Sequence, residues 1–219
     1  MASNSTVELN QLVLLPGQSV LLKNISWSKF EEIILELGEH RASILAYDQG
    51  ILEIMVPLPE HEYFKDAIGD LVKDLAEELA IEYECFGSTT WRRQERMGGA
   101  EPDNCFYIQN LPAIRGRLDI DLNSDPAPDL VLEIDITSKS LDRLPIYARL
   151  GVPEVWRYEK TQLRLYQLVN EMYVETQASL AFSEFPVKSI PDFIRQNLAS
   201  GRNALRQSFR LWVRQQIHY

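Results

Sequence analysis

Several kinds of residue are scarce in this 219-residue sequence, and each scarcity excludes a class of protein. It has two cysteines, Cys85 and Cys105, and three histidines, and their spacing does not match a zinc site. No apolar run approaches the roughly 20 residues that a membrane-spanning helix needs. The first ten residues lack the basic region and apolar core of a secretory signal. We therefore expect a cytoplasmic protein, not bound to a membrane, with both cysteines reduced and lying in strands.

Positive charge is scarce too, with 22 Lys and Arg against 32 Asp and Glu, a net charge of −10. This balance argues against nucleic acid as a partner, because phosphate binding usually accompanies a basic surplus. The basic residues are clustered, however, in Arg92–Arg96, in Arg115–Arg117 and along the segment 202–214. We expect the first two clusters to contact phosphate, and the last, with arginines at intervals of four, to pair with acids.

Hydrophobic periodicity and turn residues divide the chain into helices and strands. Ser28 and Gly38 mark the start and the end of one helix, and Asp48-Gln49-Gly50 marks the turn of a hairpin. Further helices are expected at 60–80, about 140–150, 191–199 and 202–217. Strands are expected from 81, from 103 and at 129–136, 154–159, 162–169 and 172–179. Residues 96–103 and 115–128 are the most loop-like stretches.

This order of elements predicts an α/β fold in which a mixed central β-sheet is flanked by helices. No change in composition separates two domains, so residues 1–219 are expected to form a single domain. Within it, residues 1–25 are expected to be a loose N-terminal segment. The C-terminal helices, residues 189–219, are expected to pack on the core.

The stretch "PAPDLVLEIDITSKS", residues 126–140, places three acids on one face of a predicted half-buried strand. Apolar residues alternate with Asp129, Glu133 and Asp135. Because a strand rises about 3.3 Å per residue, Glu133 and Asp135 project about 6 to 7 Å apart and can share one ion. Asp129 lies about 13 Å from Glu133, which suits a turn cap better than a ligand of that ion.

Carboxylates in this arrangement suit a hard cation such as Mg²⁺, which is typically held by one or two of them and several waters. Such an ion activates water and neutralises charge in phosphodiester hydrolysis. Asp103 begins the preceding predicted strand and could supply a further ligand. Solvation of the acids, or pairing with arginines of a neighbouring strand, would explain the same pattern.

Three stretches carry a resemblance to a known family: "GAEPDNCFYI", "APDLVLEIDITSKSLDRLPIYARLGVPEVWRY" and, more weakly, "HEYFKDAIGDL". They resemble the Uma-type restriction endonuclease family, which belongs to the PD-(D/E)XK nuclease superfamily, and they cover roughly the middle half of the chain. The resemblance implies a restriction-endonuclease-like core, a divalent-metal site and cleavage of nucleic acid.

Carried onto this sequence, Asp103 matches the first acid of the superfamily motif, Glu133 matches the second, and Asp129 matches the aspartate that opens the family's second strand. The superfamily has a lysine two residues after the glutamate, where this chain has Asp135. Lys139 and Arg143 are the candidates for a relocated cation, although an arginine is always protonated and cannot act as a base.

An accessory acid is sometimes taken from a helix in nucleases of this type, and Glu62 is the candidate here. The helix dipole favours an acid in a first turn in any case, and His61 beside it has the same ordinary explanation.

The sequence thus favours an endonuclease that hydrolyses DNA with Mg²⁺ or Mn²⁺. Asp103, Glu133, Asp135 and, at lower rank, Asp129 would be metal ligands, and Lys139 or Arg143 would assist electrostatically. A homodimer is a further expectation. One alternative is a catalytically inactive nuclease fold that binds nucleic acid or a protein. Another is an oligomerisation module whose acids are all ion-paired.

Overall fold

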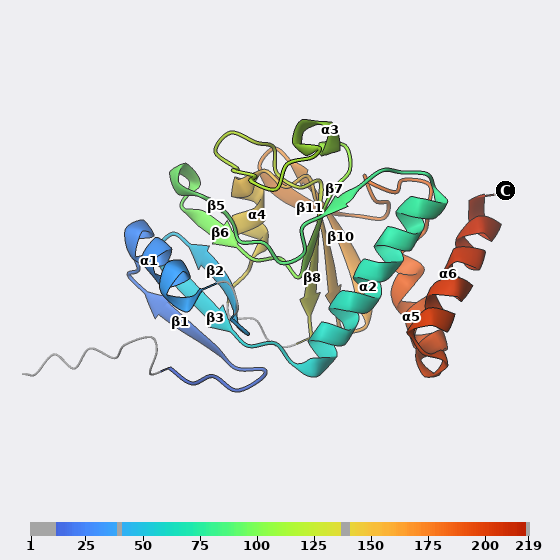
Figure 1. Cartoon of the computed structure of the whole chain (residues 1–219), viewed down its shortest axis with the longest axis horizontal. Coiled ribbons are helices and arrows are strands. Elements are labelled where there is room, and N and C mark those ends of the chain that lie inside the picture. Colours follow the sequence, from blue (N-terminus) through green and yellow to red (C-terminus); the bar gives the residue numbers. More distant parts are fainter. Residues whose placement is uncertain (1–11, 39–40, 137–140, 218–219) are drawn as a thin grey trace, which may run out of the picture.

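The computed structural model describes residues 12–38, 41–136 and 141–217, whose strands form two sheets (Figure 1). The five-stranded sheet has the order β1 (Ser19–Lys23), β3 (Ile51–Met55), β2 (Ile44–Asp48), β6 (Gly98–Ala100) and β5 (Trp91–Arg93). The six-stranded sheet has the order β11 (Met172–Thr176), β10 (Gln162–Val169), β9 (Glu154–Glu159), β8 (Leu130–Asp135), β7 (Asn104–Tyr107) and β4 (Glu84–Cys85).

Helices flank both sheets. The α-helices are α1 (Trp27–Leu37), α2 (Pro59–Glu78), α3 (Leu111–Ile114), α4 (Leu144–Leu150), α5 (Ile190–Asn197) and α6 (Arg202–Ile217). Short 3-10 helices are η2 (Gln94–Arg96), η3 (Val187–Ser189) and η4 (Leu198–Ser200). No helix in the described part of the chain is long and apolar enough to cross a membrane.

The six-stranded sheet is mixed, which confirms the predicted fold class. β8 and β9 pair in parallel, whereas β7 pairs with β8, and β9 with β10, in antiparallel. A parallel pair needs a crossover connection, and α4 lies in the segment that joins β8 to β9. The strand with the three acids is therefore central in its sheet.

β8 is buried on both faces, so the prediction of a half-buried strand is wrong. Leu130, Leu132 and Ile134 pack against α2 in one core. Val131, on the opposite face, packs with Ile146 of α4 in a second core that also includes Ala46 and Ala100 of the five-stranded sheet. The five-stranded sheet and α4 thus cover the face that carries the acids, and a single-sequence pattern contains no sign of this long-range packing.

Three further expectations are corrected at the five-stranded sheet. Residues 19–23, expected in a loose terminal segment, form β1 and pair with β3. Ser26, not Ser28, caps α1, because its Oγ accepts a hydrogen bond from the backbone N–H of Lys29 at 3.2 Å. The glycine-rich stretch expected as a loop forms β6. A Cβ on Gly99 would lie 3.1 Å from the Phe30 ring, so this strand requires glycine where α1 approaches it closely.

Other local predictions are confirmed. The hairpin turns at Gln49 and Gly50, which have φ values of 46° and 93°, as a two-residue turn between β2 and β3 requires. Cys85 and Cys105 are free thiols in β4 and β7. Burial raises the pKa of the Cys105 thiol to about 12.

The arginine stripe of α6 pairs with acids of α2, as expected for the last helix. The pairs are Arg202 with Asp70, Arg206 with Asp74, Arg210 with Asp74 and Glu77, and Arg214 with Glu78. Asp74 is fully buried and accepts from two guanidinium groups, at distances of 2.7 to 2.8 Å. These charge-assisted bonds fix α6 on α2, which packs on the six-stranded sheet.

We predict that replacing both Arg206 and Arg210 with Ala lowers the free energy of unfolding by about 3 kcal/mol, because Asp74 would stay buried without its two cations. Urea denaturation measures this loss. Arg214→Ala is the control and should cost much less, because that side chain is 58% exposed. Equal losses in the two variants would contradict the assignment.

Candidate active site

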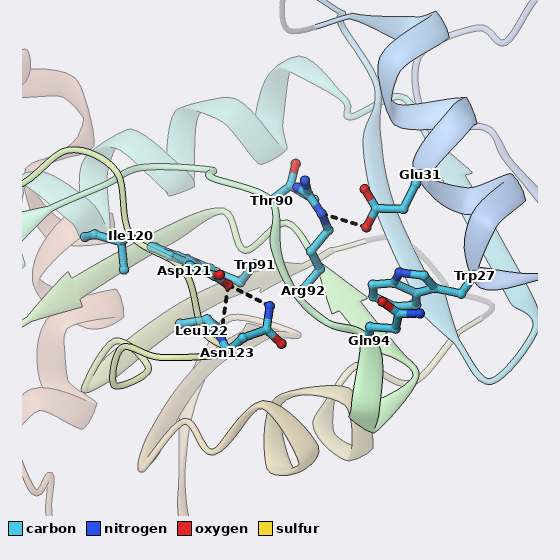
Figure 2. A pocket seen from close by; sticks show the side chains of 10 residues that line it. All are labelled: Trp27, Glu31, Thr90, Trp91, Arg92, Gln94, Ile120, Asp121, Leu122 and Asn123. Carbon is cyan, nitrogen blue, oxygen red and sulfur yellow. Dashed lines mark hydrogen bonds and ion pairs between the residues drawn. The ribbon is translucent and has the colours of Figure 1, made fainter.

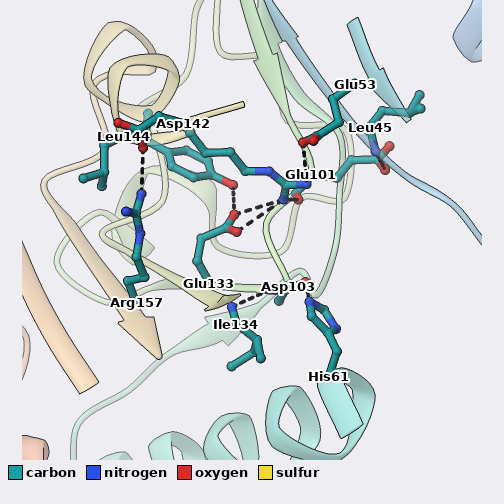
Figure 3. A network of polar contacts seen from close by, with 12 residues as sticks. Leu45, Glu53, His61, Glu101, Asp103, Glu133, Ile134, Asp142, Leu144 and Arg157 are labelled. Atoms are coloured by element: carbon teal, nitrogen blue, oxygen red, sulfur yellow. Dashed lines mark hydrogen bonds and ion pairs between the residues drawn. The ribbon is translucent and has the colours of Figure 1, made fainter. Parts of the chain in front are cut away.

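A cluster of buried polar side chains lies where the two sheets meet (Figure 3). We call it the junction cluster. Its members are Glu53 of β3, His61 of α2, Asp103 immediately before β7, Glu133 of β8, Arg143 immediately before α4, and Tyr147 of α4. They come from five separate segments of the chain, so only the folded protein brings them together.

Glu133 is 2% exposed, and α4 supplies donors to its carboxylate. Nη1 of Arg143 lies 3.3 Å from each carboxylate oxygen, and the Tyr147 hydroxyl donates to Oε1. The same Nη1 donates to the backbone carbonyl of Glu101 at 3.0 Å. Burial alone would lower the pKa of Arg143, but the charges of Glu133, Asp103 and Glu53 outweigh it and raise that pKa. The guanidinium is therefore firmly charged.

Asp103 is fully buried beside the same strand. It precedes Asn104, which pairs with Leu132, and its Oδ2 accepts from the backbone N–H of Ile134 at 2.6 Å. Its Oδ1 lies 3.1 Å from Nε2 of His61. The predicted placement of Asp103 on the strand next to Glu133 thus agrees with the sheet order.

Sequence reasoning missed three members of the cluster, Glu53, His61 and Tyr147. His61 received only an ordinary structural explanation, although it is buried against Asp103 and opens one of the stretches that carry the family resemblance. Glu53 gave no signal, because it stands alone among apolar residues in "ILEIM". In the structure it is fully buried, and its Oε2 lies 3.9 Å from Nη2 of Arg143.

The cluster contains buried carboxylates, which are the donor type, though not the arrangement, of a hard-cation site in the described part of the chain. Buried carboxylates are normally paired with cations or bound to metals, and here the charges of Glu133, Asp103 and Glu53 all act on one arginine. Such a set of oxygen donors is what Mg²⁺ prefers, and one or two carboxylates suffice for it. Over the ranges that the structure describes, no group of three or more His, Cys, Asp or Glu side chains is arranged to hold a metal ion.

The remaining predicted residues lie in different places. Asp135 ends β8 opposite Glu159, and its charge acts on Arg157 of β9. Asp129 accepts from the backbone N–H groups of Ile108 and Asn110 at 2.7 and 2.8 Å, so it anchors a loop at the other end of the strand. Burial raises its pKa, although these hydrogen bonds oppose the shift. Lys139 lies outside the described residues.

A groove of about 950 Å³ runs alongside the junction cluster, and Arg41, Glu62, Lys65, Arg92 and Glu101 are among the residues that line it. Glu62 contacts the cluster, since its Oε1 lies 3.4 Å from Nδ1 of His61. Its Oε2 accepts from Nζ of Lys65 at 2.8 Å. Burial lowers the pKa of Lys65, but Glu62 and, more weakly, Asp103 and Asp66 raise it overall. The groove is therefore lined by charged side chains, and one of them, Glu62, contacts His61 of the cluster.

The arginine clusters at residues 92–96 and 115–117 bond to carboxylates and a backbone carbonyl of this same chain. Nε of Arg92 lies 2.9 Å from Glu31, and Arg117 forms two bonds with Asp125 at 2.7 and 2.9 Å. Arg93 donates to the carbonyl of Leu122. Phosphate contact by these loops stays a prediction.

The comparison with protein families agrees with this arrangement. The model of the Uma2 family, described as "Putative restriction endonuclease", matches residues 27–199. The chain belongs to the Uma2 family. The match includes every member of the junction cluster, and it confirms the resemblance seen in the sequence.

A solved structure supports the fold of this Uma2 protein. The crystal structure of a putative nuclease belonging to DUF820 from Anabaena variabilis superposes with a TM-score of 0.51 and 18% identity. The superposition covers 72% of this chain and 94% of that one. At this identity it shows a shared nuclease-type fold, which bears out the restriction-endonuclease-like core. Among curated proteins, none matches the chain.

We predict that Tyr147→Phe lowers the free energy of unfolding by about 1.5 to 3 kcal/mol, because a buried carboxylate would lose a hydrogen-bond donor. Tyr173→Phe is the matched control, since its hydroxyl donates to a neutral acceptor, the carbonyl of Val152. That change should cost about 0.5 to 1.5 kcal/mol. Urea titrations compare the two, and a larger loss for Tyr173→Phe would contradict this role of the Tyr147 hydroxyl.

Proposed function

We propose that this Uma2 protein is an endonuclease that hydrolyses phosphodiester bonds of DNA with Mg²⁺ or Mn²⁺ as its cofactor. One observation carries the proposal. Asp103 and Glu133, the two acids that match the superfamily motif, meet in the junction cluster beside the charged Arg143. Family membership and the nuclease fold support the reaction class.

Asp103 and Glu133 would hold the ion, and Asp135, at the end of the same strand, would be a further ligand. When bound, the ion would activate water and neutralise charge on the phosphoryl group. Arg143 would donate to the negative charge that develops in the transition state, in place of the superfamily's lysine. Lys139 is the second candidate for that cation. His61 would be a positioning residue, because it contacts Asp103 and Glu62.

A second candidate function is a catalytically inactive nuclease fold that binds nucleic acid or a protein. Two observations favour it. Asp135 occupies the position of the superfamily's lysine, and the Glu133 carboxylate accepts hydrogen bonds from Arg143 and Tyr147 of this chain. Homodimerisation and a cytoplasmic location belong to either proposal, and sedimentation velocity measures the first of them.

Metal binding is the first test. We predict that saturating Mn²⁺ raises the melting temperature of the wild type, because an ion at 100 times its Kd stabilises the folded state by about 2.7 kcal/mol. Glu133→Gln should abolish the shift, and Asp135→Asn should reduce it. Glu171→Gln, which removes an acid that is 86% exposed, is the control and should keep the full shift. A shift that survives Glu133→Gln would place the ion elsewhere.

Activity is the second test. We predict that the wild type cleaves DNA in Mg²⁺ or Mn²⁺, assayed on supercoiled plasmid and on circular single-stranded DNA, and that Arg143→Met lowers the rate by at least tenfold through loss of charge stabilisation. Asp135→Lys restores the superfamily pattern and tests whether a lysine improves the rate. Circular dichroism melts of each variant show whether it folds. A wild type that neither shifts with metal nor cleaves DNA leaves the inactive nuclease fold as the better reading.

A further inference from the structure

A second pocket, of about 310 Å³, opens between α1, β5 and the loop at residues 120–123 (Figure 2). Trp27, Trp91, Arg92, Gln94, Asp121 and Asn123 are among the residues that line it. This volume is at the lower end of the range for small-molecule sites, so it suits one small planar group. None of these residues belongs to the junction cluster.

The lining combines an aromatic ring with polar groups at its edge. Trp27 is half-buried, and its ring is braced by edge-on contacts with Phe30 and Tyr47 at centroid distances of 5.4 and 5.5 Å. Asp121 fixes the Asn123 amide, accepting from its Nδ2 at 2.7 Å and from its backbone N–H at 3.0 Å. A braced aromatic ring with amide and carboxylate groups nearby can stack on a nucleobase and bond its edge.

The guanidinium of Arg92 lies at the edge of this pocket. Nε of Arg92 is held by Glu31 at 2.9 Å, and the two side chains are 41% and 33% exposed. An ion pair this exposed contributes little to stability, so the guanidinium can exchange Glu31 for a phosphate at small cost. Trp27 could therefore stack on a base while Arg92 contacts a neighbouring phosphate.

The pocket is next to the groove beside the junction cluster. Thr90 and Arg92 line both of them, and Glu62 and Glu101 line the groove. Glu62 contacts His61, and the backbone carbonyl of Glu101 accepts from Arg143. A chain of nucleotides with one base at Trp27 could thus follow the groove, past Lys65, toward the buried acids.

The burial of Asp103 and Glu133 favours single-stranded nucleic acid over a duplex as the substrate. Asp103 is 0% and Glu133 2% exposed, so a rigid duplex lying on the surface cannot bring a phosphate to them. A base that is paired and stacked in a duplex cannot also stack on Trp27 unless it is first taken out of the helix. We infer that the Trp27 pocket is a nucleobase subsite and that the substrate is single-stranded nucleic acid. This inference rests on the proposed nuclease function and names its substrate class.

Fluorescence anisotropy of the full-length protein in EDTA tests the inference without cleavage. The probes are a labelled 10-nucleotide single-stranded DNA, an RNA of the same sequence and the corresponding blunt DNA duplex. We predict that at least one single strand binds ten times more tightly than the duplex. Trp27→Ala should weaken that binding at least tenfold, and Trp27→Phe should restore most of it. The DNA and RNA arms identify the sugar.

Arg92→Ala should weaken single-strand binding and reduce the slope of log K against log salt by about one. Arg195→Ala is the matched control, since Arg195 is 42% exposed, pairs with Asp192 and lines neither the pocket nor the groove. Asn123→Leu, on an exposed loop, keeps the test valid if Trp27→Ala does not fold, because it changes the pocket without touching α1. It should also weaken binding.

Equal affinity for single strand and duplex, no binding of any probe, or full binding by folded Trp27→Ala or Asn123→Leu would overturn the inference. Its failure can be told from failure of the proposed function. If metal raises the melting temperature and the protein cleaves DNA, but Trp27→Ala has no effect on binding, only the nucleobase subsite is contradicted. If binding depends on Trp27 but there is neither cleavage nor a metal-dependent melting shift, only the nuclease function is contradicted.

Discussion

The contact between Glu133 and Arg143 is the interaction on which the arrangement of the two sheets depends. Glu133 lies in the central strand β8, Arg143 immediately precedes α4, and the same guanidinium binds the carbonyl of Glu101 between β6 and β7. One buried cation thus joins both sheets and the crossover helix. Removing one partner of such a pair leaves a buried charge, which costs about 3 to 5 kcal/mol. The fold and the candidate site therefore share one set of bonds.

A buried acid alone does not indicate a functional site, as Glu154 shows in the same sheet. It is fully buried, and its donors are Trp156 Nε1 at 2.8 Å, and Ser179 Oγ and two backbone N–H groups at 3.1 Å. Burial raises its pKa against the effect of these bonds. Neutral donors hold Glu154, so its role is to anchor the loop at residues 179–181. The junction cluster differs because several carboxylates converge on one arginine.

Local sequence patterns were sufficient for elements whose partners lie nearby, such as the β2–β3 hairpin, and for α6 with its arginine stripe. The family resemblance pointed to Asp103 and Glu133 as candidate site residues, and the fold brings both into the junction cluster. Local patterns failed where distant packing decides. β8 is covered by a second sheet, and β6 uses Gly99 because α1 approaches it. Glu53 joins the cluster only because β3 lies near Arg143 in the fold. None of these long-range contacts produces a periodic pattern of apolar residues in the sequence.

Arg143 can replace the superfamily lysine that this chain lacks in one respect only, its positive charge. Lysine can lose its proton, whereas arginine stays charged, so an arginine at this site is restricted to electrostatic work. Glu133 orients Arg143, because Nη1 of the guanidinium lies 3.3 Å from each carboxylate oxygen. The pair that joins the two sheets thus also fixes a cation that the proposed reaction uses. In the proposed hydrolysis, the proton of the attacking water must pass to a group other than Arg143.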